Sequence, residues 1–78
     1  MTKTYYVVFS DDQDIVATTY EAGFRAFDRM RRTTQGQVWL NEYSVTLDDL
    51  NAFICHGAAA FRDITPTQEL NWRKPGVL

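Results

Sequence analysis

Three aspartates stand close together early in the chain, in the stretch SDDQDI at residues 10–15. Asp11, Asp12 and Asp14 carry oxygen ligands, so a calcium loop is the first chemistry to test. An EF-hand spreads its ligands over about twelve residues and closes with a bidentate glutamate, and no such frame follows Asp14. We therefore predict no metal site. Two interpretations stay open: an acidic hairpin turn, or a docking surface whose carboxylates pair with Lys or Arg of a partner.

A second group of charges is basic. Arg25, Arg29 and Arg32 are spaced i, i+4 and i+7, which places them on one face of a helix. Such a stripe can contact phosphates, but a solvated helix face has the same pattern, and Asp28 lies nearby. The chain has no aromatic platform, GXXG loop or zinc-finger spacing. We keep the three arginines as candidate partner-binding residues, and favour a protein or ribonucleoprotein partner over direct contact with nucleic acid.

Cys55 and His56 suggest a nucleophile beside its base, but neighbours on a helix point about 100° apart. They are the only cysteine and histidine in the chain, so neither a Cys/His metal site nor a Cys-His-Asn set can be assembled. The four glycines are isolated and form no phosphate-binding loop. We predict a protein that is not an enzyme, with no catalytic residue and no cofactor.

Composition sets the broad class of the protein. The chain has 78 residues, 45% of them apolar, and a net charge of −2, which predicts one globular domain over residues 1–78. Residues 74–78, with Pro75 and Gly76, are expected to form a flexible tail. A single cysteine fits a reducing compartment, so we expect the cytoplasm. The apolar run Tyr5–Phe9 is far too short to span a membrane.

Local patterns predict the elements that position these residues. Thr4–Ser10 and Ile15–Thr18 are β-branched and aromatic runs that indicate an antiparallel hairpin with the aspartates in its loop. Thr18 and Glu21 have capping-box spacing, so a helix should begin there and run to about residue 34. Gly36 should follow it with positive φ. The apolar stripe of this helix is Tyr20, Gly23, Phe24, Ala26, Phe27 and Met30.

The second half of the chain is less regular. Gln37–Val45 predicts a strand that is apolar on both faces. Thr46 should cap a second helix, and residues 58–64 fit a helix or an edge strand, with helix favoured. A threonine followed by proline predicts a last short helix over residues 66–73. This helix would carry Trp72, which we select as a partner-binding aromatic because tryptophan is enriched at interface hot spots.

These elements predict an α+β fold with a small three-stranded sheet, made of a hairpin, a helix and a strand. A helical crossover makes the strands Ile15–Thr18 and Gln37–Val45 parallel, and the right-handed rule then favours a sheet with Thr4–Ser10 between them, in the order 2-1-3. The helix that ends near residue 34 should cover one face, with one or two helices at the C-terminal end. Since the central strands are apolar on both faces, the second face needs the C-terminal segment, a sister subunit in a homodimer, or a partner.

The plan of YYVVFS, IVAT, TYEAGFRAFDRMRR and QVWLNEYSV, over residues 4–45, resembles that of small phage-encoded anti-CRISPR proteins. The resemblance implies an inhibitor that binds a CRISPR effector complex in the host cytoplasm. Acidic side chains would occupy a DNA-binding surface, and Asp11, Asp12 and Asp14 would be the first contacts. The alternative is an antitoxin-like regulator, whose hairpin-then-helix start is similar and which would act through the arginine face.

Overall fold

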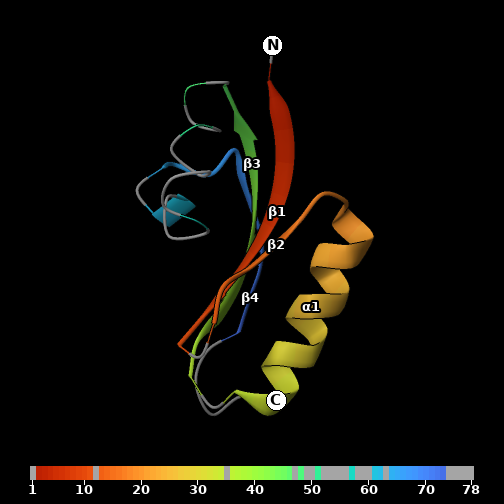
Figure 1. The fold of residues 1–78 in the computed structure, drawn as a ribbon. Coiled ribbons are helices and arrows are strands. Elements are labelled where there is room, and N and C mark those ends of the chain that lie inside the picture. Colours follow the sequence, from red (N-terminus) through yellow and green to blue (C-terminus); the bar gives the residue numbers. More distant parts are fainter. Residues whose placement is uncertain are drawn as a thin grey trace.

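The computed structural model describes residues 2–11, 13–34, 36–46, 48, 51, 57, 61–62 and 64–73. Residues 71–73 are described by their backbone alone. The elements run in the order β1 (Lys3–Ser10), β2 (Ile15–Ala17), α1 (Tyr20–Thr33), β3 (Val38–Val45) and β4 (Gln68–Arg73). The strands form one sheet in the order β2-β1-β3-β4. Figure 1 shows α1 lying along one side of this sheet.

The first half of the predicted topology is confirmed. β1 is central and pairs antiparallel with β2 on one side and with β3 on the other. Because both neighbours are antiparallel to β1, they are parallel to each other, as the helical crossover requires. The sheet order 2-1-3 is therefore correct for these strands, and the α+β class holds.

The three-stranded sheet is wrong, because residues 68–73 form β4 instead of the predicted helix. Thr65 and Pro66 suggested the start of a helix, but the residues that follow them pair instead with the edge of β3 that β1 leaves open. Thr67 donates its N–H to the Glu42 carbonyl at 2.8 Å, and its Oγ1 accepts the Ser44 N–H at 2.9 Å. Pairing with β3 satisfies the backbone of residues 68–73, and this long-range gain overrides the local capping preference.

The ends of α1 differ from the prediction by small but informative amounts. The N-cap is Thr19 instead of Thr18: its Oγ1 accepts the Ala22 N–H at 3.2 Å. The helix ends at Thr33, and Thr34 is already extended. Gly36 does not adopt positive φ; the Asp11 carboxylate occupies the place where a Cβ would stand. A side chain at position 36 would displace only the end of the exposed Asp11 side chain, so neither space nor backbone angles require glycine there.

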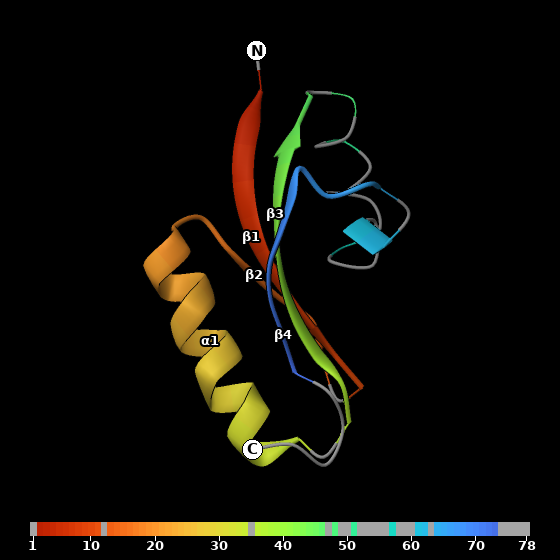
Figure 2. The same cartoon turned by 180° about the vertical axis from the view of Figure 1, so that it is seen from behind.

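Both faces of the sheet are buried, as the alternation in β1 and β3 predicted. The layer between the sheet and α1 consists of Val8, Ala26, Phe27, Met30, Val38 and Leu40. The layer on the opposite face consists of Tyr5, Val7, Phe9, Tyr43, Val45 and Phe61. Figure 2 shows residues 61–62 and 64–67, which precede β4, on that opposite face. Phe61, which is 0% exposed, and the partly buried Ile64 supply its cover, so the C-terminal segment does part of the covering that was expected of it.

Two predicted helices and the predicted tail fall largely outside the described residues. Asp48 and Asn51, from the second helix, are helical, and Phe61 and Arg62 lie in a 3₁₀ turn. Cys55, His56 and residues 74–78 are not among the described residues. Within the described residues, no helix has the length and apolarity needed to cross a bilayer.

Candidate functional site

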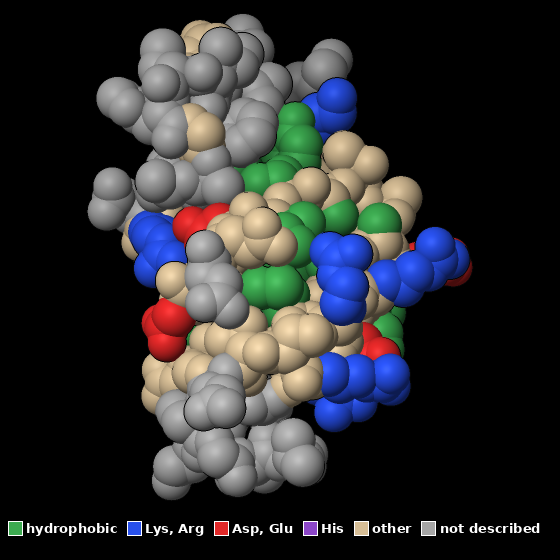
Figure 3. Space-filling model, turned by 60° about the horizontal axis from the view of Figure 1, so that its bottom comes forward, with side chains coloured by type: hydrophobic (Ala, Val, Ile, Leu, Met, Phe, Trp, Pro, Cys, Tyr) green, Lys and Arg blue, Asp and Glu red, His purple; other side chains and the backbone are tan. Residues whose placement is uncertain are grey.

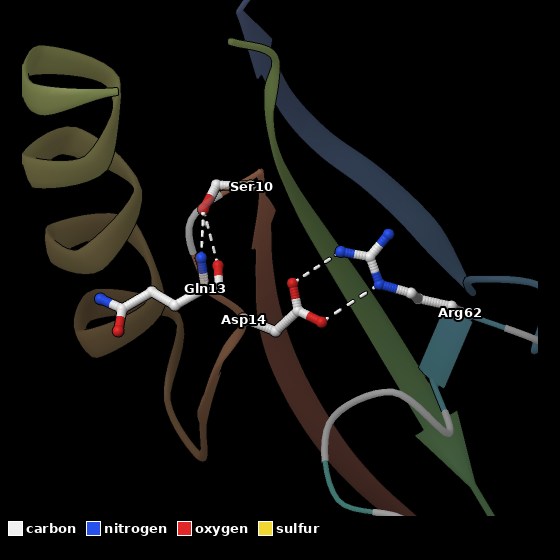
Figure 4. Close-up of polar contacts among 4 residues, drawn as sticks. All are labelled: Ser10, Gln13, Asp14 and Arg62. Carbon is white, nitrogen blue, oxygen red and sulfur yellow. Dashed lines mark hydrogen bonds and ion pairs between the residues drawn. The ribbon is translucent and has the colours of Figure 1, made fainter. Parts of the chain in front are cut away.

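The aspartate stretch forms the turn between β1 and β2, in which Asp11 and Gln13 are exposed and Asp14 is partly buried. Ser10 Oγ donates to the Gln13 carbonyl at 2.6 Å and accepts the Gln13 N–H at 3.1 Å. The Gln13 side chain points towards α1, while Asp14 points to the other side of the sheet, where Arg62 lies (Figure 4). Consecutive strand-like positions alternate in direction, which is why these two side chains diverge.

Asp14 and Arg62 form a bidentate ion pair. Arg62 Nε donates to Asp14 Oδ2 at 3.1 Å, and a terminal guanidinium nitrogen donates to Oδ1 at 2.8 Å. The hydrogen bond with Asp14 is the main cause that raises the pKa of Arg62. The same guanidinium lies 5.0 Å from the centroid of the Phe9 ring. Asp14 therefore ties the 3₁₀ turn to the hairpin, and its side chain is only 16% exposed.

The three aspartates thus do not form one free acidic surface in the described part of the chain. Asp14 is occupied by Arg62. Asp11 is exposed, and its carboxylate rests against Gly36. Asp12 lies outside the described residues. The predicted docking surface consequently offers one exposed described carboxylate in place of three.

The arginines of α1 divide into two pairs. Arg31 and Arg32 both bind Asp28, at 2.7 and 3.0 Å. Arg25 and Arg29 are exposed and form no ion pair with any described residue. Arg32, which the sequence grouped with them, is drawn towards Asp28 and away from that group. Two unpaired cations, one helical turn apart, remain available for a ligand.

Arg25 and Arg29 border a groove between β2 and α1, with a volume of about 480 Å³. Its other lining residues are mostly small or apolar: Ile15, Val16, Ala17, Thr18, Ala22 and Ala26. Figure 3 shows basic side chains gathered on the flank where α1 lies, beside apolar side chains. We call this feature the β2–α1 groove.

β2 is an edge strand, because it ends the strand order and pairs only with β1. Its outer edge therefore presents backbone N–H and C=O groups that no described strand covers. Arg25 and Arg29 were found from their spacing, but the β2 residues of the groove were missed. A three-residue strand carries no sequence signal that shows which of its two edges stays open.

The remaining predicted contacts are less informative. Trp72 lies in β4, where its Cα pairs with that of Trp39, and not in a terminal helix as expected; its side chain is outside the description. Within the described residues, no group of three or more His, Cys, Asp or Glu side chains is placed to hold a metal ion. Comparison with protein-family models, curated proteins and solved structures finds no match to this chain.

Proposed function

We propose that this domain is a non-enzymatic binding protein whose β2–α1 groove takes an extended, acidic segment of a protein partner. The observation that carries the proposal is the pair Arg25 and Arg29, which have no ion pair among the described residues and border a groove beside an open strand edge. Edge strands with unpaired backbone groups bind peptides by strand addition, in which main-chain hydrogen bonds supply affinity and side-chain pockets supply specificity.

The spacing of the two arginines suits such a segment. Four residues of α-helix rise about 6 Å, and two residues of a strand rise about 6.6 to 6.8 Å. Alternate residues of an added strand point to the same face of the sheet. Two acidic residues separated by one position would therefore reach Arg25 and Arg29 together, while the residue between them faces the other way.

A protein partner fits better than a nucleic acid. A DNA-binding protein neutralises phosphates along the duplex with many Lys and Arg side chains, whereas the groove offers two arginines that form no ion pair with a described residue. The net charge of −2 also opposes association with a polyanion. A carboxylate-bearing strand needs only the two cations, the apolar floor and the open backbone edge.

Inhibition of a CRISPR effector complex, which the resemblance implies, stays a prediction about the identity of the partner. The role of the acidic turn in that hypothesis is limited by the Asp14–Arg62 ion pair, because docking through Asp14 would first have to break it. The antitoxin-like alternative uses the same arginines, with a nucleic acid in place of the acidic strand.

A synthetic peptide in which glutamate alternates with threonine tests the proposal. Binding is measured by fluorescence anisotropy of the labelled peptide against the wild-type protein and the double variant Arg25→Ala, Arg29→Ala. We expect the double variant to bind about tenfold more weakly, from two partly exposed charge pairs of about 0.7 kcal/mol each. A peptide with glutamine in place of glutamate should lose the same factor.

The matched control is the double variant Arg31→Ala, Arg32→Ala, which removes equal charge from arginines already bound to Asp28. It should bind the peptide like the wild type. Equal weakening in both double variants would show that only net charge matters and would refute the groove. Two other results would point to the alternatives. If a protein partner is captured and only the variant Asp11→Asn, Asp14→Asn fails to bind it, the acidic turn is the contact. Salt-sensitive binding of duplex DNA that requires Arg25 and Arg29 would instead support the antitoxin-like regulator.

A further inference from the structure

We propose that a pocket on the opposite face of the sheet, centred on Asn41, binds a small, neutral, planar ring that carries an N–H donor. This pocket has a volume of about 270 Å³ and is separate from the β2–α1 groove. Its apolar walls come from Phe9, Trp39, Tyr43 and Ile64, and charged residues stand at Arg62 and Glu69. The inference does not depend on the function proposed for the groove.

The decisive feature is an unsatisfied acceptor. Asn41 is 8% exposed and lines the pocket. Its Nδ2 donates to the Tyr43 hydroxyl at 3.4 Å, but its Oδ1 is buried and accepts no hydrogen bond from any described residue. Folded proteins satisfy nearly all buried polar atoms, and an orphaned one in a pocket calls for an unseen partner. A ligand N–H at this point would complete the Asn41 amide.

The apolar residues around Asn41 are fixed in place by their own contacts. The rings of Phe9 and Tyr43 meet edge to face with centroids 6.2 Å apart, and Tyr43 also packs 5.0 Å from Phe61. Arg62 is held over Phe9 and by Asp14. A pocket whose walls are already held in position loses little conformational freedom when a ligand enters. Flat aromatic walls favour a flat ligand, because rings pack well by stacking or edge-to-face contact.

Size and charge narrow the ligand further. A volume of about 270 Å³ lies just below the range of typical drug-sized sites, about 300 to 1,000 Å³, so one ring with a small substituent fits. The Arg62 charge is balanced by Asp14. Glu69 therefore leaves the lining with an excess negative charge, which disfavours an anion. A neutral aromatic amide or amino-substituted heterocycle satisfies both conditions.

Titration of the ¹⁵N-labelled full chain with two matched probes tests this inference. Benzamide carries the ring and the N–H donor, and methyl benzoate carries the ring without a donor. We expect benzamide to shift the amide resonances around Asn41 and Tyr43 and to bind about fivefold more tightly than methyl benzoate, the usual effect of one hydrogen bond. The variant Asn41→Leu, of similar size, should bind both probes equally.

The control variant Ser44→Ala changes an exposed residue further along β3 and should keep the benzamide preference. The probe comparison on the wild-type protein stands even if Asn41→Leu does not fold. Equal binding of both probes, binding of neither, or a benzamide preference that survives in folded Asn41→Leu would each overturn the proposal. If neither probe binds, or if the preference survives in Asn41→Leu, an ordered water molecule would be the expected hydrogen-bond donor to Asn41 Oδ1. Neither outcome bears on the peptide assay, so the two sites are tested independently.

Discussion

Gly23 offers the sharpest test of how α1 sits on the sheet. It is buried on the inner side of α1, and a Cβ added there would stand 2.8 Å from Tyr6 Cβ and 3.2 Å from Leu40 Cδ1. Tyr6 Cβ is attached directly to the backbone of β1, which is paired on both sides, so it has little room to retreat. We therefore expect Gly23→Ala to destabilise the protein even though alanine is the better helix former.

The magnitude follows from two opposed effects. Alanine in place of glycine within a helix stabilises by about 1 kcal/mol. Inserting a methyl group into a packed layer costs about 1 to 3 kcal/mol, and the upper part of this range applies because two atoms stand close to the new group. The net expectation is a loss of about 1 to 2 kcal/mol in the free energy of unfolding.

Urea denaturation measures this loss from the shift of the transition midpoint at constant slope. The variants Arg25→Ala and Arg25→Gly provide the calibration, because Arg25 is exposed on the same helix and their difference isolates helix propensity. Arg25→Ala should exceed Arg25→Gly by about 1 kcal/mol. A Gly23→Ala protein as stable as the wild type, or more stable, would show that α1 does not approach β1 this closely and would refute the packing argument.

Three further predictions concern the cap, the second layer and alkaline pH. Thr19→Ala should cost about 1 kcal/mol of unfolding free energy through loss of the N-cap, whereas Thr18→Ala should cost clearly less; the reverse order in thermal denaturation would restore the sequence-based cap. Phe61→Ala should lower the free energy of unfolding by about 3 to 5 kcal/mol, a large part of the roughly 4 to 12 kcal/mol expected for a domain of this size. Urea denaturation should therefore show a far lower midpoint. A small effect would mean that the face of the sheet opposite α1 is covered without Phe61. Burial is the main cause that raises the pKa of both Tyr6 and Tyr43 above the ordinary 10.0, so the folded state holds these phenol protons more tightly than the unfolded chain does. Their contribution to stability should be complete below about pH 10 and lost as pH rises through the raised values, and urea titrations at stepped pH should show a shallower alkaline decline in Tyr43→Phe.

The sequence alone was sufficient for the hairpin, α1, β3 and the burial of both sheet faces. These follow from local periodicity: alternation in TYYVVFS and VWLNEYSV, and a 3.6-residue stripe in α1, which buries Gly23, Ala26, Phe27 and Met30. Tyr20 and Phe24 lie at one edge of the stripe and stay 46% and 40% exposed. Periodicity marks the direction of a helical face, but the width of the layer beneath determines how much of that face is covered.

The candidate sites follow the same division. Residue type and spacing identified Arg25 and Arg29, since both lie on one helix and their separation is set by helix geometry alone. The i, i+4 spacing of Asp28 and Arg32 is itself a local signal of the ion pair that they form, but nothing local marks Asn41 as a buried amide with an orphaned oxygen. That feature depends on which atoms the fold brings within hydrogen-bond range.

Tertiary structure alone decided three things: that residues 68–73 pair with β3, that Asp14 binds a guanidinium 48 positions away, and that β2 keeps an open edge beside α1. The first two are relations between segments distant in the chain, and the third follows from the order of the strands in the sheet. Local propensities differ by about 1 kcal/mol or less per residue for most residue types, whereas a strand that completes a sheet gains backbone pairing and buried area at every position. That larger, non-local free energy determines the outcome where the local signal is weak.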